Sequence, residues 1–235
     1  MLRLPYPFRV TEVFPFLNSI NVIPGIRAAW VERVPELDIT GDRDEAMRRL
    51  RPFHETALMS FAGPHARWWR AEQIHGNSVA IIPDSPEIIA PDGLPVVPHV
   101  DGLLTREPGH ALAIYVADCG AIWLADQKSG AIGLLHSGKN GTAANIFGNA
   151  LTQMAHHFGT CPHDVTAVLS PCIRPPDYEV DFAAQIACQA RQAGVGNFID
   201  CGFNTASDPS RFYSYRKQLG KTGRLMALIV RDFPP

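Results

Sequence analysis

Short apolar runs alternate with amphipathic stretches along this chain of 235 residues. Three runs in the middle of the chain are rich in β-branched and aromatic residues, and they predict buried strands at Ala111–Ala117, Ala121–Ala125 and Ala131–Leu135. Similar patterns predict further strands at Gly25–Arg33, Val79–Ile82, Val165–Leu169, Phe198–Cys201 and Leu225–Val230. A looser alternation over Arg9–Ile23, interrupted by proline, predicts one or two edge strands.

Other segments carry apolar residues at helical spacing. Asp42 is the expected N-cap of a helix that reaches about Phe53, and Asn140 or Thr142 is the expected cap of a helix that ends near Phe158. Further helix starts are expected at Asp181, where Gly194 ends the helix, and at Asp208-Pro209. The Pro- and Gly-rich stretch 83–98 predicts a surface loop. Helices and strands alternate without repeats, so we expect one mixed α/β domain over residues 1–235.

The composition narrows the range of partners. A net charge of -2 with no Lys/Arg run gives no electrostatic footprint for nucleic acid or for an acidic membrane surface, so we expect small molecules as partners. The chain has no signal-peptide pattern and no apolar run of membrane-spanning length, which predicts a cytoplasmic protein. The odd number of cysteines and the absence of a C-x-x-C pair disfavour a disulfide framework and a zinc ribbon. The cysteines are Cys119, Cys161, Cys172, Cys188 and Cys201.

Reactive side chains lie where the central strands are expected to end. Asp118 and Cys119 follow the first run, His136 follows the third, and His75 lies in an expected turn. A thiolate with two imidazoles could hold Zn²⁺ and leave a fourth position open for water. Alternatively, Cys119 could be a nucleophile with His136 as its base. The spacing of these residues does not choose between a metal site and a nucleophile.

The segment Ser137–Thr142 supplies features that suit an anion. Gly138 and Gly141 permit close backbone approach, Lys139 adds a charge, and a helix is expected to begin nearby. We therefore expect phosphate to bind there, with Arg51 or Arg216 as a second cation.

Several short motifs, in this order, resemble those of the bacterial multicopper polyphenol oxidase family, also called the laccase-domain or YfiH-like family. The first are Gln73-Ile74-His75-Gly76, Asp101-Gly102, Ala117-Asp118-Cys119 and His136-Ser137-Gly138. The later ones are Ser170-Pro171-Cys172-Ile173, Tyr178-Glu179-Val180, Phe212-Tyr213-Ser214-Tyr215-Arg216 and Thr222-Gly223-Arg224. The resemblance covers about residues 25–232 and is specific, because the motifs are chained along the sequence.

This resemblance implies a layered α/β/β/α sandwich of mixed sheets flanked by helices. It also implies a metal site formed by His75, Cys119 and His136, with zinc as the expected metal and copper as the alternative. The implied activity is phosphorolysis of purine nucleosides (adenosine or inosine), a transferase reaction, and adenosine deamination, a hydrolase reaction, is a further possibility. Copper-dependent phenol oxidation is the alternative activity.

We also expect roles for individual residues. Asp118, Cys119 and His136 are the expected catalytic residues, with Asp118 either supporting the ligands or accepting a proton from metal-bound water. The expected substrate-binding residues are Arg51, Gln73, Ser137, Lys139, Asn140, Tyr178 and Arg216.

The chain departs from the family pattern at three places. Where the family typically reads H-A-G-W-R-G, Lys139 and Asn140 replace the Trp and Arg. The family's Asn-Arg pair is represented by Leu50-Arg51, and its F-T-R segment is absent around Trp30–Arg33. These changes predict either an altered substrate or a metal-binding protein whose activity has lapsed.

Overall fold

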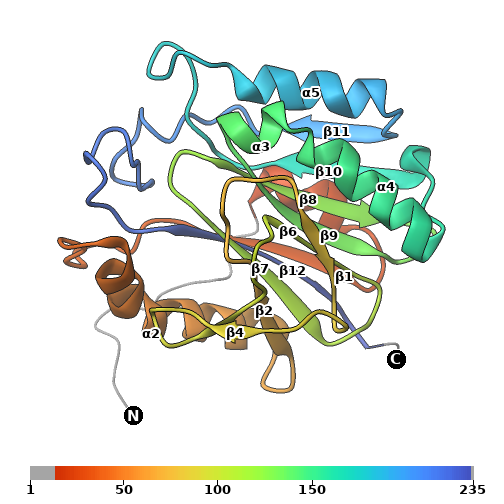
Figure 1. Cartoon of the computed structure of the whole chain (residues 1–235), viewed down its shortest axis with the longest axis horizontal. Helices are drawn as coiled ribbons and strands as arrows, with labels where there is room; N and C mark the ends of the chain where they lie inside the picture. Colours follow the sequence, from red (N-terminus) through yellow and green to blue (C-terminus); the bar gives the residue numbers. More distant parts are fainter. Residues whose placement is uncertain (1–13, 234–235) are drawn as a thin grey trace.

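The computed structural model describes residues 14–233, whose strands form two main sheets and one small hairpin (Figure 1). The four-stranded sheet contains, in spatial order, β1 (Ile26–Val31), β12 (Leu225–Arg231), β7 (His110–Val116) and β2 (Arg67–Arg70). The six-stranded sheet contains, in spatial order, β11 (Asn197–Asp200), β10 (Val165–Leu169), β8 (Gly120–Asp126), β9 (Ile132–Ser137), β6 (Gly102–Thr105) and β3 (Val79–Ile81). The hairpin pairs β4 (Ile88–Ile89) with β5 (Pro95–Val96). Both main sheets mix parallel and antiparallel pairs.

The two main sheets pack face to face around a shared apolar core. Trp123 on β8 crosses from one sheet to the other, because its indole N–H donates to the carbonyl of Leu228 on β12 over 2.9 Å. Its ring also meets the ring of Trp30 on β1 edge to face, with the centroids 5.8 Å apart. Strands β7 and β8 are covered on both faces, which explains why they are nearly continuous apolar runs in the sequence.

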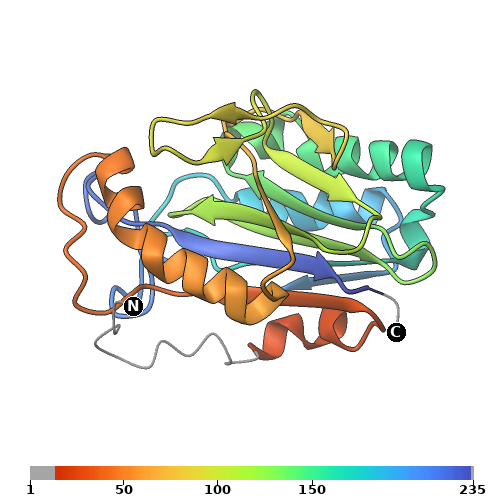
Figure 2. The same ribbon diagram turned by 90° about the horizontal axis from the view of Figure 1, so that it is seen from below.

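Helices cover the outer face of each sheet (Figures 1 and 2). Helix α2 (Arg43–Ala62) lies on the four-stranded sheet, and the helices on the six-stranded sheet are α3 (Lys139–Ala143), α4 (Ile146–Phe158) and α5 (Phe182–Gln192). Short helical turns also occur at Pro15–Leu17, α1 (Asn18–Asn21) and Pro162–Asp164. The layered α/β/β/α sandwich is therefore confirmed, while a single domain over the full 1–235 stays a prediction. Within residues 14–233, no helix is both long and apolar enough to span a membrane.

Most of the predicted strands are confirmed with small shifts at their ends. The largest consequence is for His136, which lies inside β9 instead of following it. The Asp42 cap is also confirmed, because its carboxylate accepts from the Glu45 N–H over 2.8 Å, and α2 continues through Pro52 to Ala62. The stretch 83–98, expected to be a loop, contains the β4–β5 hairpin.

Three predicted elements are wrong. The described part of the Arg9–Ile23 segment is helical at Pro15–Asn21, and residues 9–13 lie outside the described range. Turns follow Asp208-Pro209, without a helix. The helix expected from Thr142 to Phe158 is divided at Asn145, whose left-handed backbone (φ 57°) ends one helix and whose side chain caps the next by accepting from the Gly148 N–H. The N-cap of α3 is Gly138, so neither Asn140 nor Thr142 is a cap.

Candidate metal centre and its cavity

His75, Cys119 and His136 come together from two connections and one strand of the fold. His75 lies between β2 and β3, Cys119 lies between β7 and β8, and His136 is near the end of β9. Their potential ligand atoms all lie within 4.8 Å of one another, and no other group of three or more such side chains occurs in residues 14–233. The structure therefore brings together the three residues that the sequence indicated.

Asp101 fixes the backbone of His75 and the imidazole of His136. Its carboxylate is fully buried and accepts from the backbone N–H groups of His75 and Gly76 over 2.9 and 2.7 Å. The same carboxylate meets Nδ1 of His136 at 2.7 Å, which leaves Nε2 as the nitrogen available to a metal. Sequence analysis included Asp101 in a motif but gave it no role. The available signal was a carboxylate placed directly before the buried strand β6.

The electrostatics of this cluster favour a thiolate. Burial opposes ionisation of Cys119, but the neighbouring His136 and His75 lower the pKa of its thiol overall. Burial likewise disfavours the charged His136, but Cys119 and Asp101 raise the pKa of its imidazole. The hydrogen bonds that Asp101 accepts lower the pKa of its own carboxyl, although burial acts in the opposite direction. Cys119 is thus poised to bind as the anion that metals require.

Asp118 fixes a loop that borders the site. Its oxygens accept from the Thr205 hydroxyl and from the backbone N–H of Arg216, each over 2.7 Å. Its backbone is left-handed (φ 84°), as are those of Gln73 (φ 63°) and His75 (φ 65°), a conformation that is uncommon for non-glycine residues. The visible role of this carboxylate is therefore to position the loop at 204–216.

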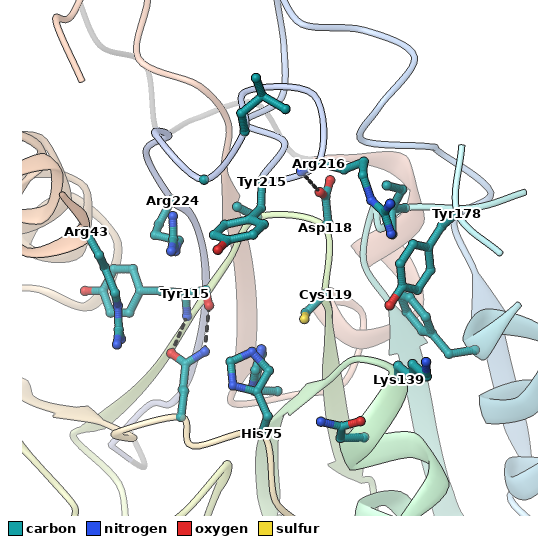
Figure 3. A pocket seen from close by; sticks show the side chains of 18 residues that line it. Arg43, His75, Tyr115, Asp118, Cys119, Lys139, Tyr178, Tyr215, Arg216 and Arg224 are labelled. Carbon is teal, nitrogen blue, oxygen red and sulfur yellow. Dashed lines mark hydrogen bonds between the residues drawn. The ribbon is translucent and has the colours of Figure 1, made fainter. Parts of the chain in front are cut away.

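The cluster lies at the middle of a cavity of about 840 Å³ (Figure 3). At one end lie Lys139, Tyr178 and Arg216, and at the other end lie Arg43 and Arg224. A volume of this size accommodates a small organic ligand. Arg43 was not among the predicted site residues and Arg224 had no predicted role, because no pattern in the sequence indicates that the start of α2 meets the loop before β12.

Five of the seven expected substrate residues line the cavity, namely Gln73, Lys139, Asn140, Tyr178 and Arg216. Lys139 and Asn140 are exposed at the cavity, and the Arg216 guanidinium lies over the Tyr178 ring at 4.9 Å while pairing with Glu179 at 3.1 Å. Gln73 also lines the cavity, but its amide is hydrogen-bonded to both backbone polar groups of Tyr115.

Two of the expected substrate residues do not line the cavity. Arg51 faces solvent from α2 and pairs with Glu55 at 2.7 Å, one turn along the same helix. Ser137 is fully buried and shares a hydrogen bond with the Thr142 hydroxyl over 2.8 Å. One side chain points outward and the other is enclosed, so neither faces the cavity, and their contact with substrate stays a prediction.

The glycines after His136 are required by packing. A Cβ atom on Gly138 would lie 2.5 Å from the Cys119 sulfur, and one on Gly141 would lie 3.1 Å from the carbonyl oxygen of Gly76. Helix α3, which follows, has only five residues. The glycines thus allow this segment to approach the metal ligands, and the phosphate cradle expected here has no geometric support.

The chain matches the model of a known protein family. The model of the multi-copper polyphenol oxidoreductase laccase family matches residues 37–186 and 180–232. The chain belongs to this family. The chain is 29% identical over 230 residues to the purine nucleoside phosphorylase YlmD of Geobacillus stearothermophilus. The match covers 83% of this chain and 82% of the relative. It is 33% identical over 169 residues to a purine nucleoside phosphorylase of Streptomyces coelicolor, covering 69% and 67% of the two chains.

Solved structures show the same laccase-family fold. Bacillus licheniformis YfiH has a TM-score of 0.72 and 21% identity, covering 87% of this chain and 92% of that one. YlmD from Geobacillus stearothermophilus has a TM-score of 0.70 and 24% identity, covering 90% and 93%. At these identities the structural likeness establishes the fold.

Proposed function

We propose that this protein is a zinc-dependent phosphorylase of purine nucleosides such as adenosine or inosine. The observation that carries the proposal is the cluster His75, Cys119 and His136 at the middle of a cavity with cationic side chains at both ends. Relatives with the same fold are named purine nucleoside phosphorylase, which supports the reaction class. A cytoplasmic location is part of the proposal, because a reducing compartment keeps an unpaired thiol such as Cys119 available.

The three side chains fit a zinc ion. One thiolate and two imidazoles are a donor set typical of zinc, and three protein ligands leave the fourth position open, as in catalytic sites. When bound, zinc supplies a Lewis acid that polarises an oxygen of the substrate or of water. The set also matches the core of a blue copper centre. Within residues 14–233, however, the single cluster has ligands for one ion, whereas the family name implies several copper ions.

Phosphorolysis sets requirements that the chain's own residues can meet. A phosphate oxygen forms a bond to C1′ as the bond from C1′ to the purine nitrogen breaks. The electron pair of that bond leaves with the purine, and the proton of hydrogen phosphate ends on the purine. The enzyme must therefore hold an anion on one side of the sugar and the purine on the other.

We assign the purine and the sugar to the end with Tyr178 and Lys139. Tyr178 offers a ring face, held against Arg216 and meeting Phe182 edge to face at 6.2 Å. Lys139 and Asn140 offer hydrogen-bonding groups beside His136 in place of the family's Trp and Arg. Asp118 fixes the position of Arg216 through its backbone, so it acts as a positioning residue.

The test is to incubate zinc-loaded protein with inosine or adenosine, with and without phosphate, and to separate the products by chromatography. Phosphate-dependent release of free purine with ribose 1-phosphate is the expected result. Inosine formed from adenosine without phosphate would instead show deamination. Oxygen consumption with a phenol in copper-loaded protein would show oxidase activity, and no product from any substrate would show a lapsed enzyme.

A further inference from the structure

We propose that Arg43 and Arg224 together form the phosphate-binding subsite of this cavity. The inference rests on the proposed phosphorolysis and adds which end of the cavity holds the anion. It replaces the Ser137–Thr142 segment, where packing accounts for the glycines.

The two arginines share one end of the cavity although they are far apart in sequence. Arg43 is the first residue of α2, and Arg224 directly precedes β12. Figure 3 shows both guanidinium groups on the side opposite Tyr178 and Lys139, with His75 and Cys119 in between. Arg224 interacts electrostatically with Cys119 and Asp118, so an anion held there lies beside the candidate metal centre.

Neither arginine forms a direct ion pair with an acidic side chain among residues 14–233. The side chain of Arg224 donates only to backbone carbonyls, those of Thr222 and Gly223 at 3.1 and 2.9 Å, and Arg43 makes no hydrogen bond or ion pair. The carboxylate that interacts with Arg43 over a distance, Asp92, is hydrogen-bonded to the buried Arg70. By contrast, Arg216 at the other end pairs with Glu179. Both guanidinium groups therefore lack a direct acidic contact, although Asp118 and Asp92 act on them from a distance.

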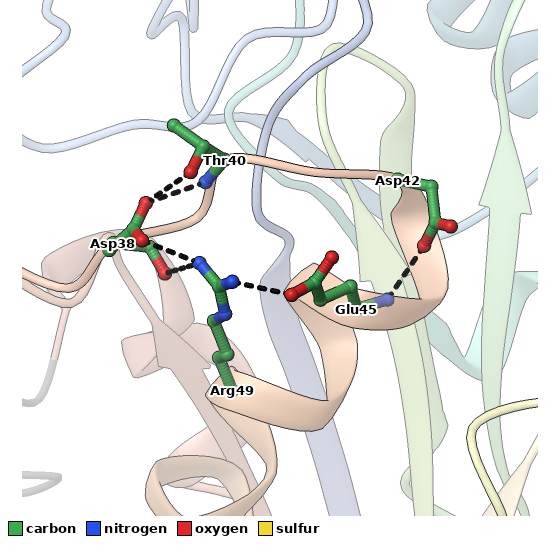
Figure 4. Close-up of polar contacts among 5 residues, drawn as sticks. All are labelled: Asp38, Thr40, Asp42, Glu45 and Arg49. Atoms are coloured by element: carbon green, nitrogen blue, oxygen red, sulfur yellow. Dashed lines mark hydrogen bonds and ion pairs between the residues drawn. The ribbon is translucent and has the colours of Figure 1, made fainter.

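A network of polar contacts fixes the start of α2 and with it the backbone of Arg43 (Figure 4). Asp42 caps the helix, and Arg49 joins Glu45 to Asp38, whose carboxylate also binds the backbone and the hydroxyl of Thr40 at 2.9 and 2.6 Å. Arg49 thus pairs with Asp38 and Glu45, and Asp42 accepts from a backbone N–H. Arg43, in the first turn of α2, takes no part in these contacts, and its side chain faces the cavity.

Helix α2 also anchors Arg224. His54, fully enclosed on this helix, makes a hydrogen bond to the backbone of Arg224. The two cations are thus held by one helix, Arg43 directly and Arg224 through His54. An anion site needs this kind of preorganisation, because two like charges must be kept together before the ligand arrives.

The two cations disfavour each other in the absence of a ligand. Burial and the charge of Arg43 lower the pKa of Arg224 to about 10, which still leaves it charged at neutral pH. A phosphate dianion relieves this repulsion and accepts the fork of donors on each guanidinium. With phosphate at this end and the purine at the Tyr178 end, the nucleophile and the leaving group lie on opposite sides of the sugar, as displacement at C1′ requires.

The test compares Arg43→Gln with Arg48→Gln, which removes the same charge from an exposed site on the same helix away from the cavity. Phosphate binding is measured by phosphorus-31 NMR titration of the zinc-loaded protein, and the KM values for phosphate and nucleoside are measured separately. Arg43→Gln should weaken phosphate binding and raise the phosphate KM by about 10- to 100-fold, with the nucleoside KM nearly unchanged. Arg43→Lys should retain part of the affinity, and Arg48→Gln should match the wild type.

Several outcomes overturn the subsite. They are wild-type phosphate affinity in Arg43→Gln, loss of phosphate binding in Lys139→Gln instead, and no phosphate binding by the wild type. Phosphate-dependent turnover that is indifferent to Arg43 removes the subsite but leaves the proposed function standing. Arg43-dependent phosphate binding without turnover of any nucleoside supports the subsite and removes the function.

Discussion

The middle of the cavity and its two ends are built in different ways. The middle is formed at the ends of strands in the buried sheets, and the fully buried Asp101 holds both histidines through hydrogen bonds. The ends carry exposed side chains such as Lys139 and Arg43, which start short or peripheral helices. This difference teaches that the core fixes the candidate metal centre, whereas side chains that the core does not constrain line both ends of the cavity.

Replacing a ligand at the middle should have the largest effect. Cys119→Ser removes the thiolate, so the purified protein should contain zinc only at background level and should show no phosphorolysis. Elemental analysis and the chromatographic assay measure this. Cys161→Ser changes an exposed cysteine that is not part of the cluster and should keep both properties. Full zinc retention by Cys119→Ser would contradict the ligand assignment.

The second-largest effect should come from replacing Asp101, which holds the two histidines through hydrogen bonds. Asp101→Asn weakens the hold on Nδ1 of His136 and should reduce zinc affinity by about 10- to 100-fold, measured by competition with a chelator. Asp126→Asn is the matched control, because Asp126 is also buried and accepts from Ser129 and Lys128 but lies away from the cluster. An equal loss of zinc affinity in both variants would show a general defect of folding instead.

At the Arg224 end, the anchor His54 should make stability depend on pH. Burial lowers the pKa of His54 to about 3, below its ordinary value of 6.5, so the folded protein binds fewer protons than the unfolded chain between these values. The contribution of His54 to the free energy of unfolding should therefore be fully present above pH 6.5. It should decrease as the pH falls below this value, by at most about 1.4 kcal/mol per pH unit. Urea unfolding of wild type and His54→Leu at pH 7, 6 and 5 should show a flatter profile in the variant. Parallel profiles would contradict a buried neutral His54.

The smallest effect is expected at Arg51. Its ion pair with Glu55 is exposed and joins adjacent turns of one helix, so Arg51→Ala should change the free energy of unfolding by about 0.5 kcal/mol or less. The KM values for phosphate and nucleoside should stay at wild-type levels, because Arg51 does not line the cavity. A raised KM for either would show that the side chain reaches the site after all.

The sequence predicted the middle of the site better than its ends, for a physical reason. Buried strands impose apolar runs, so a Cys or His at the end of such a run is conspicuous, and Cys119 and His136 were found in this way. His75 was placed in an expected turn and was selected as a third ligand for these two. Arg43 begins a helix that is distant in sequence from Arg224. No local sequence pattern indicates that the two residues lie at the same end of the cavity. The sequence did not indicate that Arg51 lies outside the cavity, because the facing of a helical residue depends on a rotation of about 100° per position, which places Leu50 in the core and Arg51 in solvent.

The contact between Gly138 and the Cys119 sulfur has a consequence for how this enzyme can be altered. Any side chain at position 138 would collide with the candidate metal ligand, so that position tolerates no change. The next two positions, Lys139 and Asn140, face the cavity without holding the fold together. A selection experiment that randomises 139 and 140 while keeping 138 as glycine should yield folded, metal-binding proteins with diverse substrate preferences. Substrate preference could thus change at positions 139 and 140 while Gly138 keeps the candidate metal centre intact.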